Sequence, residues 1–152
     1  MDAVVARLKQ MGLELPKKGS LGSYVAGVRA GDLVFVSGGG PQRADGTFIT
    51  GKVDSDVDME TAQEAAKLSA LYCLASVREV IGDLDRVTRI VKLLGFVNSA
   101  PGFTGQHVVM NGASDLLVSV FGERGKHARS SVGMAELPMN IAVEVELIAQ
   151  VK

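Results

Sequence analysis

The sequence has few of the residues that build disulfide-held or metal-held frameworks. Its 152 residues include one cysteine, two histidines and no tryptophan. Cys73 has no partner for an internal disulfide, and two histidines are too few for a multi-histidine metal site. A hydrophobic core must therefore hold the chain together, and a domain of this length buries enough surface for that. We expect neither a metal nor a cofactor.

An excess of one charge and long apolar runs are also absent. Sixteen basic and 17 acidic residues give a formal net charge of −1, which argues against nucleic-acid binding because neutralising phosphates requires a basic surface. No apolar run reaches the length of a bilayer span. Residues 1–10 carry Asp2 and Lys9 and lack the apolar stretch of a signal peptide. We expect one cytoplasmic domain over residues 1–152 with no membrane contact.

Apolar spacing predicts three helices. The first dozen residues repeat apolar side chains at helical intervals, and residues 1–21 are expected to form a helical N-terminal extension. The clearest helix runs from about Thr61 to Ile81, where Thr61 and Glu64 match a capping box and Gly82 follows as a terminator. Another helix is predicted over Gln106–Phe121.

Short runs of β-branched residues predict the strands. They are Tyr24–Val28, Leu33–Val36, Val87–Val97, Arg129–Met134 and Ile141–Val151. The turn Ala30-Gly31-Asp32 joins the first two runs as a hairpin. This order of elements predicts an α+β fold, with a mixed sheet, two helices packed on one face, and the N-terminal helix in addition.

The last strand predicts how the second face of the sheet is used. Val143, Val145 and Leu147 give it one apolar face. The other face carries Glu144 and Glu146 beside apolar neighbours. A half-apolar face on a sheet covered on one side must be polar or covered, so this pattern indicates contact with another subunit.

Several residues that could carry chemistry have plainer explanations. The run Ser37-Gly-Gly-Gly-Pro41 resembles a phosphate loop, but Pro41 and the turn that follows argue against the helix such a loop requires. A bend where a ligand or another backbone approaches closely fits better. His107 and His127 lack a nucleophile frame and are expected at helix ends or on the surface. Cys73, within an apolar helix pattern, is expected in the core.

Arg129 is the strongest candidate for a binding residue. It begins a strand directly after a glycine-rich helix end, and its planar guanidinium can donate to both oxygens of a carboxylate. Glu144 and Glu146 share one face of the last strand, about 7 Å apart by strand rise. One of them could line a pocket and position a water, with its pKa raised by its like-charged neighbour. The alternative is a surface arginine with one carboxylate ion-paired and the other solvated.

These segments resemble the Rid (YjgF, or "endoribonuclease L-PSP") family. His127-Ala-Arg129-Ser-Ser-Val-Gly, Leu137-Pro138 and Val143-Glu-Val-Glu146 are similar to its C-terminal signature. Gly22-Ser-Tyr24 and Val36-Ser37-Gly38 are similar to its N-terminal pieces, in the same order. The resemblance covers roughly residues 22–150.

The resemblance implies a chorismate-mutase-like fold and a homotrimer with ligand sites in the clefts between subunits. In the family's deaminase branch the arginine holds the carboxylate of a 2-imino acid or its enamine while water attacks the imine carbon. Carried over, Arg129 anchors the carboxylate and Glu144 positions or activates water. The other implied site residues are Tyr24, Ser37, Asn111 and Ser131.

The sequence departs from that branch at three places. Gly39 stands where glutamine is usual, Ser131 stands where cysteine is frequent, and residues 1–21 form an extension. Three hypotheses follow: hydrolysis of small carboxylated imines, non-catalytic binding or sensing of small 2-oxo or carboxylic acids, and, least favoured by the charge balance, a ribonuclease or translation inhibitor.

Overall fold

A five-stranded mixed sheet forms the centre of the computed structural model, which describes residues 2–19 and 22–152. The strands lie in the order β1-β2-β5-β3-β4. Their bounds are β1 Gly27–Ala30, β2 Leu33–Val36, β3 Val87–Asn98, β4 Ala128–Met134 and β5 Val143–Val151. Neighbouring strands are antiparallel except β3 and β4, which are parallel. The predicted mixed sheet is confirmed.

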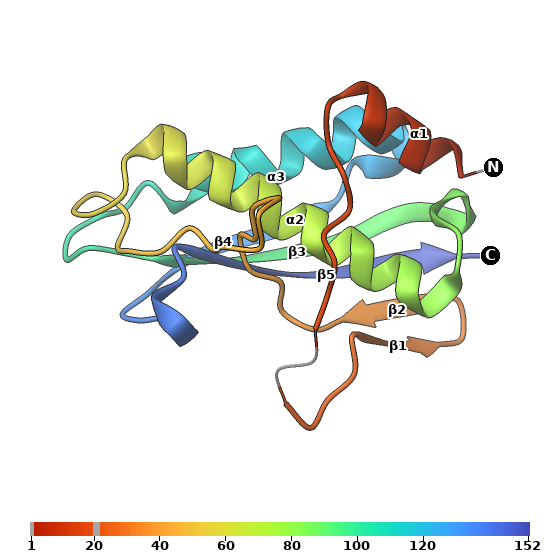
Figure 1. Cartoon of the computed structure of the whole chain (residues 1–152), viewed down its shortest axis with the longest axis horizontal. Coiled ribbons are helices and arrows are strands. Elements are labelled where there is room, and N and C mark those ends of the chain that lie inside the picture. The colour runs from red at the N-terminus through yellow and green to blue at the C-terminus, as the bar shows by residue number, and fades with distance from the viewer. Residues whose placement is uncertain (1, 20–21) are drawn as a thin grey trace.

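Two long helices cover one face of this sheet (Figure 1). They are α2, Met59–Ile81, and α3, Gln106–Phe121. The shorter α1, Ala3–Gln10, lies at the end of the molecule where both chain termini are found. Residues 2–19 and 22–152 also contain three short 3-10 helices: η1 Leu84–Arg86, η2 Gly122–Gly125 and η3 Pro138–Asn140. The predicted arrangement of two helices on one face, with an additional N-terminal helix, is therefore confirmed.

The start of α2 differs from the prediction. Asp58, and not Thr61, is the N-cap: the Asp58 carboxylate accepts a hydrogen bond of 2.8 Å from the backbone N–H of Thr61. An aspartate is at least as good a cap as a threonine, and it also places negative charge at the positive end of the helix dipole. The capping-box assignment was wrong because Met59 and Glu60 continue the helix toward the N-terminus. The predicted end is confirmed, with Gly82 at φ +83°.

The observed starts of the first and last strands also differ from the predicted ones by a few residues. The hairpin pairs Gly27 with Val36 and turns at Gly31, whose φ of +62° suits glycine, so the first strand starts three residues later than predicted from Tyr24. The last strand starts at Val143 because Asn140, with φ +56°, ends a tight turn just before it.

The core lies between the sheet and the helices. Val143, Val145 and Leu147 of β5 are almost completely buried, as their alternation predicted. The same layer receives the inner faces of α2 and α3. Cys73 is also fully buried, and its sulfur lies 3.1 Å from the Val145 carbonyl oxygen, so it is the core residue that the helix pattern indicated.

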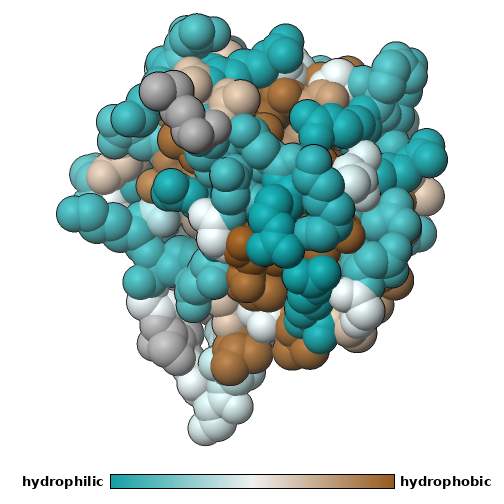
Figure 2. Space-filling model, turned by 90° about the vertical axis from the view of Figure 1, so that its right-hand side faces the viewer, coloured by the Kyte–Doolittle hydropathy of each residue, from teal (hydrophilic) through white to brown (hydrophobic). Residues whose placement is uncertain are grey.

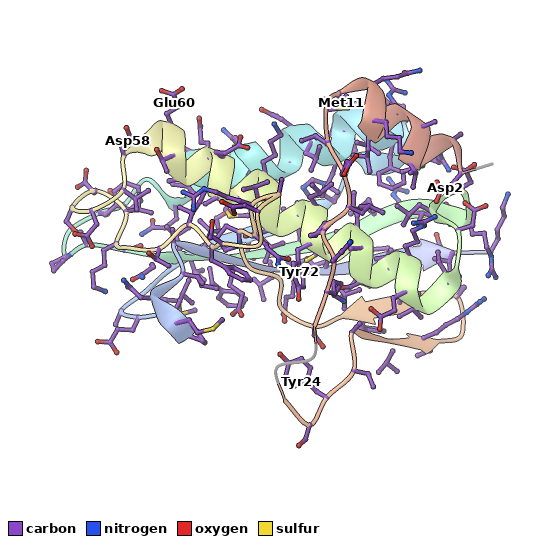
Figure 3. All side chains as sticks on the ribbon, viewed as in Figure 1. Asp2, Met11, Tyr24, Asp58, Glu60 and Tyr72 are labelled. Carbon is purple, nitrogen blue, oxygen red and sulfur yellow. The ribbon has the colours of Figure 1, made fainter. Side chains whose placement is uncertain are left out.

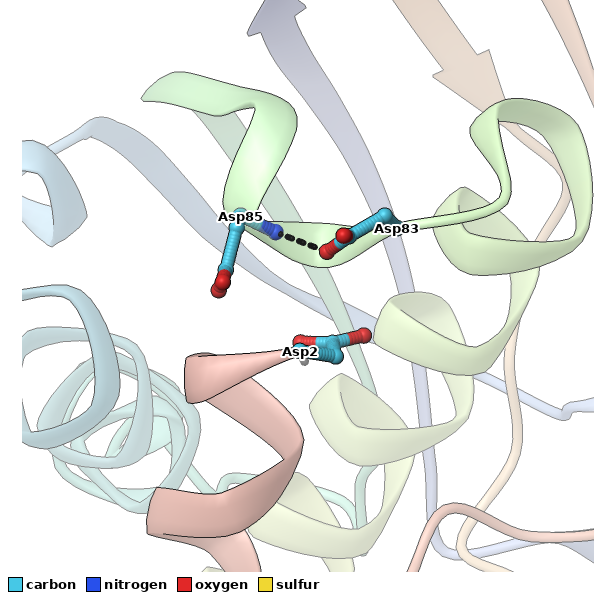
Figure 4. A group of neighbouring side chains, drawn as sticks. All are labelled: Asp2, Asp83 and Asp85. Carbon is cyan, nitrogen blue, oxygen red and sulfur yellow. Dashed lines mark hydrogen bonds between the residues drawn. The ribbon is translucent and has the colours of Figure 1, made fainter.

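Reciprocal caps attach α1 to the rest of the domain, and Figure 4 shows how Asp2 lies beside Asp83 and Asp85 where the start of α1 meets η1. The Asp85 carboxylate accepts hydrogen bonds from the N–H groups of Ala3 and Val4, at 2.8 and 2.9 Å. In return, one oxygen of Asp2 accepts from Leu84 N–H at 3.3 Å while the other caps α1 itself. These bonds satisfy N–H groups that a helix start leaves without partners. Of the extension expected to be helical over residues 1–21, only Ala3–Gln10 form a helix within the described residues 2–19, and these caps attach that helix to the domain; residues 1, 20 and 21 lie outside the described residues.

The second face of the sheet is open in a single chain and half apolar. Apolar side chains on this face are Val28, Phe35, Leu94, Phe96, Val132 and Ile148. Val28, Phe35 and Val132 are 57%, 43% and 39% exposed. Figure 2, which views the molecule from one end, likewise shows apolar side chains reaching the surface among hydrophilic ones. The mixed character predicted from the last strand is confirmed.

Candidate functional site

Arg129 lies in a seam between the edge strand β4 and helix α3. In the sheet Arg129 pairs with Leu93 of β3, and the Arg129 side chain points toward the helices. Nη1 donates to the Asn111 side-chain oxygen at 3.0 Å and to the Ser114 hydroxyl at 3.1 Å, and Nη2 donates to the His107 carbonyl oxygen at 3.1 Å. The guanidinium is therefore held in one orientation along the first turns of α3.

The guanidinium keeps donors free for a ligand. Of its five N–H groups, three are used in these bonds. The N–H of Nε and one N–H of Nη2 have no partner within residues 2–19 and 22–152, and no carboxylate in that part of the chain forms an ion pair with Arg129. Nε and Nη2 are neighbouring nitrogens on one planar group, which is the geometry that a carboxylate accepts.

The neighbourhood of Arg129 also favours an anion. Gly105 precedes α3 without a side-chain cap, and no acidic residue lies in the first turn of the helix. The positive end of the helix dipole is therefore uncompensated on the side where the arginine lies. An anion bound here would be attracted by both the Arg129 guanidinium and the positive end of the α3 dipole.

Of the two side chains of α3 that contact Arg129 Nη1, only one was predicted from the sequence. The family resemblance implied Asn111 as a site residue, and in the structure its side-chain oxygen accepts a hydrogen bond from Arg129. Ser114 was not singled out. A pattern in the sequence could have indicated Ser114, because His107, Asn111 and Ser114 follow each other at helical spacing and share one face of α3. Without knowing that β4 lies beside that face, nothing marks them as arginine partners.

Glu144 lies on the open face of the sheet. It pairs with Phe96 in the sheet, and Gly38 packs so closely on it that a Cβ there would lie 2.8 Å from a carboxylate oxygen. Partial burial raises the pKa of Glu144 above its ordinary value, and the negative charge of Glu146 raises it further. The predicted direction is confirmed, with loss of hydration as the larger cause. A carboxyl group with a raised pKa is suited to accept a proton from water near neutral pH.

One chain does not bring Arg129 and Glu144 together. The two side chains point to opposite faces of the sheet, and β3 separates their strands. Two strand spacings across and three residues along put their Cα atoms about 14 Å apart. A small metabolite cannot touch both groups within one protomer.

Tyr24 and Ser37 lie near the opposite edge of the sheet from Arg129. They flank the open end of the β1–β2 hairpin. Tyr24 stands on a loop that projects from the domain and is 57% exposed (Figure 3). The Ser37 hydroxyl donates to the Val25 carbonyl oxygen at 2.6 Å and so holds this loop. That bond uses the only hydrogen of the hydroxyl, so Ser37 can offer a ligand only lone pairs.

Ser131 follows Arg129 by two residues on the same face of β4. Its hydroxyl is buried and has no hydrogen-bond partner among the described residues. A buried unpaired hydroxyl costs stability, and native proteins rarely keep one without a role. It shares the helix-facing side with the arginine, as the strand alternation requires.

The glycine run after β2 is a close-approach segment. Gly39 exchanges backbone hydrogen bonds with Val145 at 2.7 and 3.0 Å, and a Cβ on it would lie 3.0 Å from the Tyr72 ring. The chain then forms a bridge between Gln42 and Phe48, with no helix. The interpretation as a bend packed against another backbone is confirmed, and a phosphate loop is excluded.

A metal centre has one candidate in the described part of the chain. Asp2, Asp83 and Asp85 bring one carboxylate oxygen each within 4.8 Å of one another. All three carboxylates already accept backbone hydrogen bonds that cap α1 and η1, as Figure 4 illustrates for Asp83 and Asp85. This cluster acts as structural capping.

The comparisons with known proteins agree with this architecture. The model of the family described as "YjgF/chorismate mutase-like, putative endoribonuclease" matches residues 5–151. The chain belongs to this family. It is 44% identical to Protein TCP17 of Trypanosoma cruzi over 97% of this chain and 93% of that one. None of the helices in the described part has the length and apolar content that crossing a membrane requires.

Two solved structures are also similar. The protein Atu1372 of Agrobacterium tumefaciens, a protein of unknown function, shares 44% identity over 99% of this chain and 95% of its own, with a TM-score of 0.92. E. coli TdcF, solved with bound serine, shares 25% identity over 88% of this chain and 92% of its own, with a TM-score of 0.59.

Proposed function

We propose that this protein binds small carboxylate-bearing metabolites at Arg129 and hydrolyses carboxylated imines or enamines to 2-oxo acids and ammonia. The observation that carries the proposal is the guanidinium, which three hydrogen bonds fix and which keeps two adjacent donors without a partner among the described residues. TdcF, a similar protein, holds serine, which is itself a small carboxylate. The family membership supports an enzymatic role.

The proposed reaction needs no redox step. An enamine first tautomerises to the imine. Water then adds to the imine carbon while a base takes one of its protons and the nitrogen gains one, so that the C=N bond becomes a C–N single bond. The new hydroxyl group loses its proton as the C=O bond forms and the C–N bond breaks, and the protonated nitrogen leaves as ammonia. The products are the 2-oxo acid and ammonia, so atoms balance with one water consumed. Imines hydrolyse readily, so orientation and modest acid–base help suffice. Glu144, with its raised pKa, is the proposed base.

The proposed site requires more than one copy of the chain. Since Arg129 and Glu144 lie on opposite faces of one sheet, a complete site needs Glu144 from a neighbouring protomer. The open face supports such an assembly. It carries Lys92 on β3 and Glu146 on β5, and neither forms an ion pair within the described residues. Opposite charges on different strands allow one part of this face to pair with another part of it on a neighbouring copy, and a homotrimer with sites between subunits is the proposed form.

Turnover of an imine made in the assay tests the proposal. With 2-aminoacrylate generated in situ, we expect 2-oxo acid and ammonia to form faster than in buffer alone. Arg129→Ala should raise KM by about ten- to a hundredfold, the equivalent of a charge-assisted hydrogen bond. Arg7→Ala, at an exposed arginine of α1, should leave KM unchanged. Equal rates with and without protein would refute the hydrolase.

A non-catalytic binder is the second candidate. The distance between Glu144 and Arg129 favours it, because it leaves Arg129 without a nearby base within one chain. Calorimetry with a small 2-oxo acid separates the two functions. Binding that Arg129→Ala abolishes, together with no imine turnover, identifies a binder.

A further inference from the structure

His127 connects the end of α3 to the candidate site through two short contacts. Its Nδ1 lies 2.6 Å from the Gly125 carbonyl oxygen, and its Nε2 lies 2.9 Å from the Ser114 hydroxyl oxygen. A carbonyl oxygen only accepts hydrogen bonds, so Nδ1 must carry a proton. In the neutral ring Nε2 is then an acceptor, and the Ser114 hydroxyl must donate to it.

This tautomer fixes the direction of every bond up to the arginine. The single hydrogen of the Ser114 hydroxyl points at His127, which leaves its lone pairs for other donors. One of them accepts from Arg129 Nη1 at 3.1 Å. The chain of hydrogen bonds therefore runs in one direction, from Arg129 through Ser114 and His127 to Gly125, with the Ser114 hydroxyl accepting from Arg129 and donating to His127.

The far end of this chain is anchored in backbone. Gly125 lies against α3 so closely that a Cβ would overlap the Leu117 carbonyl group. The Gly125 carbonyl oxygen that orients His127 therefore has little freedom to move. An immovable acceptor at one end is what a chain of hydrogen bonds needs in order to orient the group at the other end.

We infer that His127 is a positioning residue for the carboxylate site, an inference that rests on the proposed function of Arg129. By accepting the hydrogen bond of the Ser114 hydroxyl, His127 keeps a serine lone pair facing Arg129 and the guanidinium flat along α3. Nε and the second Nη2 N–H then point away from the helix, toward the ligand. Without His127, the Ser114 hydroxyl is free to rotate and donate to the carbonyl four residues earlier in α3, as helical serines do.

Two substitutions at His127 test this role. His127→Phe keeps the ring and removes both nitrogens, and we expect KM for the imine and Kd for a 2-oxo acid to rise about tenfold, with kcat changed much less. His127→Gln places an amide oxygen near the former Nε2 position, so it can still accept from Ser114. We expect it to restore most of the affinity. Thermal unfolding of each variant separates positioning from folding.

Ser114 provides the independent check. Ser114→Ala should weaken 2-oxo acid binding to a similar extent, and His127→Phe should add little in the Ser114→Ala background, because both act through one chain of bonds. Full additivity of the two effects would overturn the inference. If His127→Phe fails to fold, Ser114→Ala decides alone, because 2-oxo acid binding as tight as in the wild type would overturn the inference.

The Arg129→Ala variant distinguishes the two ways of failing. If Arg129→Ala binds the 2-oxo acid as tightly as the wild type, the proposed function fails and the positioning role fails with it. If Arg129→Ala abolishes binding while His127→Phe binds normally, only the positioning role is wrong.

Discussion

Gly112 of α3 lies directly against the backbone of Gln63 in α2. A Cβ on Gly112 would overlap the Gln63 carbonyl group, and the Gln63 side chain bonds to the Val108 carbonyl oxygen one turn earlier, at 3.0 Å. The two helices therefore approach at a point where only glycine fits. This contact sets the position of α3, and with it the His107, Asn111 and Ser114 face that holds Arg129.

Alanine at Gly112 should disrupt this approach. Since the neighbouring atoms are backbone and cannot rotate away, we expect Gly112→Ala to lower the free energy of unfolding by about 2–3 kcal/mol or more, despite alanine's better helix propensity. Urea titration measures the change. Ser119→Ala, at an exposed position of the same helix, is the control and should change stability by about 0.5 kcal/mol at most. Equal effects would show that the helices do not touch at Gly112.

Acid should release α1 before the rest of the domain unfolds. Hydrogen bonds from Ala3 and Val4 hold the pKa of Asp85 below its ordinary value of 3.8. A lowered folded-state pKa means that these bonds stabilise the fold above pH 3.8 and lose their effect as the pH falls through the lower folded value. Hydrogen exchange of an N-terminal peptide should therefore accelerate in acid.

Asp85→Asn should show the same loosening of α1 already at neutral pH. Asp54→Asn, at an exposed loop position with φ +82° that asparagine tolerates, is the control. Unchanged exchange over residues 3–10 in the Asp85 variant would contradict the capping role.

Cys73 should be inert toward thiol reagents in the native protein. Complete burial raises the pKa of the thiol to about 12, so almost no thiolate exists at neutral pH. We expect iodoacetamide to label Cys73 only in denaturant, with a native rate that follows opening of the domain. Rapid labelling at pH 7 without denaturant would show that α2 does not cover this residue.

Glu144 should cost stability at neutral pH while serving function. Its folded-state pKa is raised, chiefly by burial, so the protonated form is favoured by folding. The contribution of protonated Glu144 to the free energy of unfolding is fully present below pH 4.5, the ordinary pKa. It is lost as the pH rises through the folded-state pKa. Glu144→Gln should therefore raise Tm at pH 7, with the gain shrinking toward pH 4, while abolishing imine turnover. A Tm lowered at pH 7 would contradict the burial of an unpaired charge.

The sequence predicted the elements better than their mutual contacts. Helical spacing located α3 to the residue, and alternation located the buried face of β5, because both patterns repeat along one segment. The N-cap of α2 was misplaced, since Asp58 and Thr61 are both acceptable caps and local sequence does not decide between them.

The candidate site could be predicted only in part. The resemblance pointed to Arg129 and Asn111, and the structure places them in contact. Ser114 and the orienting role of His127 depend on β4 lying beside α3, a long-range relation that no local pattern contains. The opposite orientation of Arg129 and Glu144 likewise depends on strand pairing, and it is the reason why the proposed site includes a second protomer.

A negative charge on the open face of the sheet should break the proposed trimer. Val132 on β4 and Val118 on α3 are 39% and 37% exposed in one chain, so they differ in location but hardly in accessibility. If the open face packs against other copies, Val132→Glu buries an unpaired carboxylate there and should shift the protein to a monomer. Val118→Glu should leave the assembly unchanged.

Sedimentation velocity across a range of concentrations measures this shift. The imine turnover of the same samples tests whether the active site needs more than one protomer. Because Arg129 and Glu144 cannot reach one ligand within a single chain, the monomeric Val132→Glu protein should lose imine turnover while its Arg129 remains intact. Mixing it with inactive Arg129→Ala protein should not restore activity, since the damaged face still cannot pack. A monomer with full activity would place the whole site in one protomer and remove the reason for the assembly.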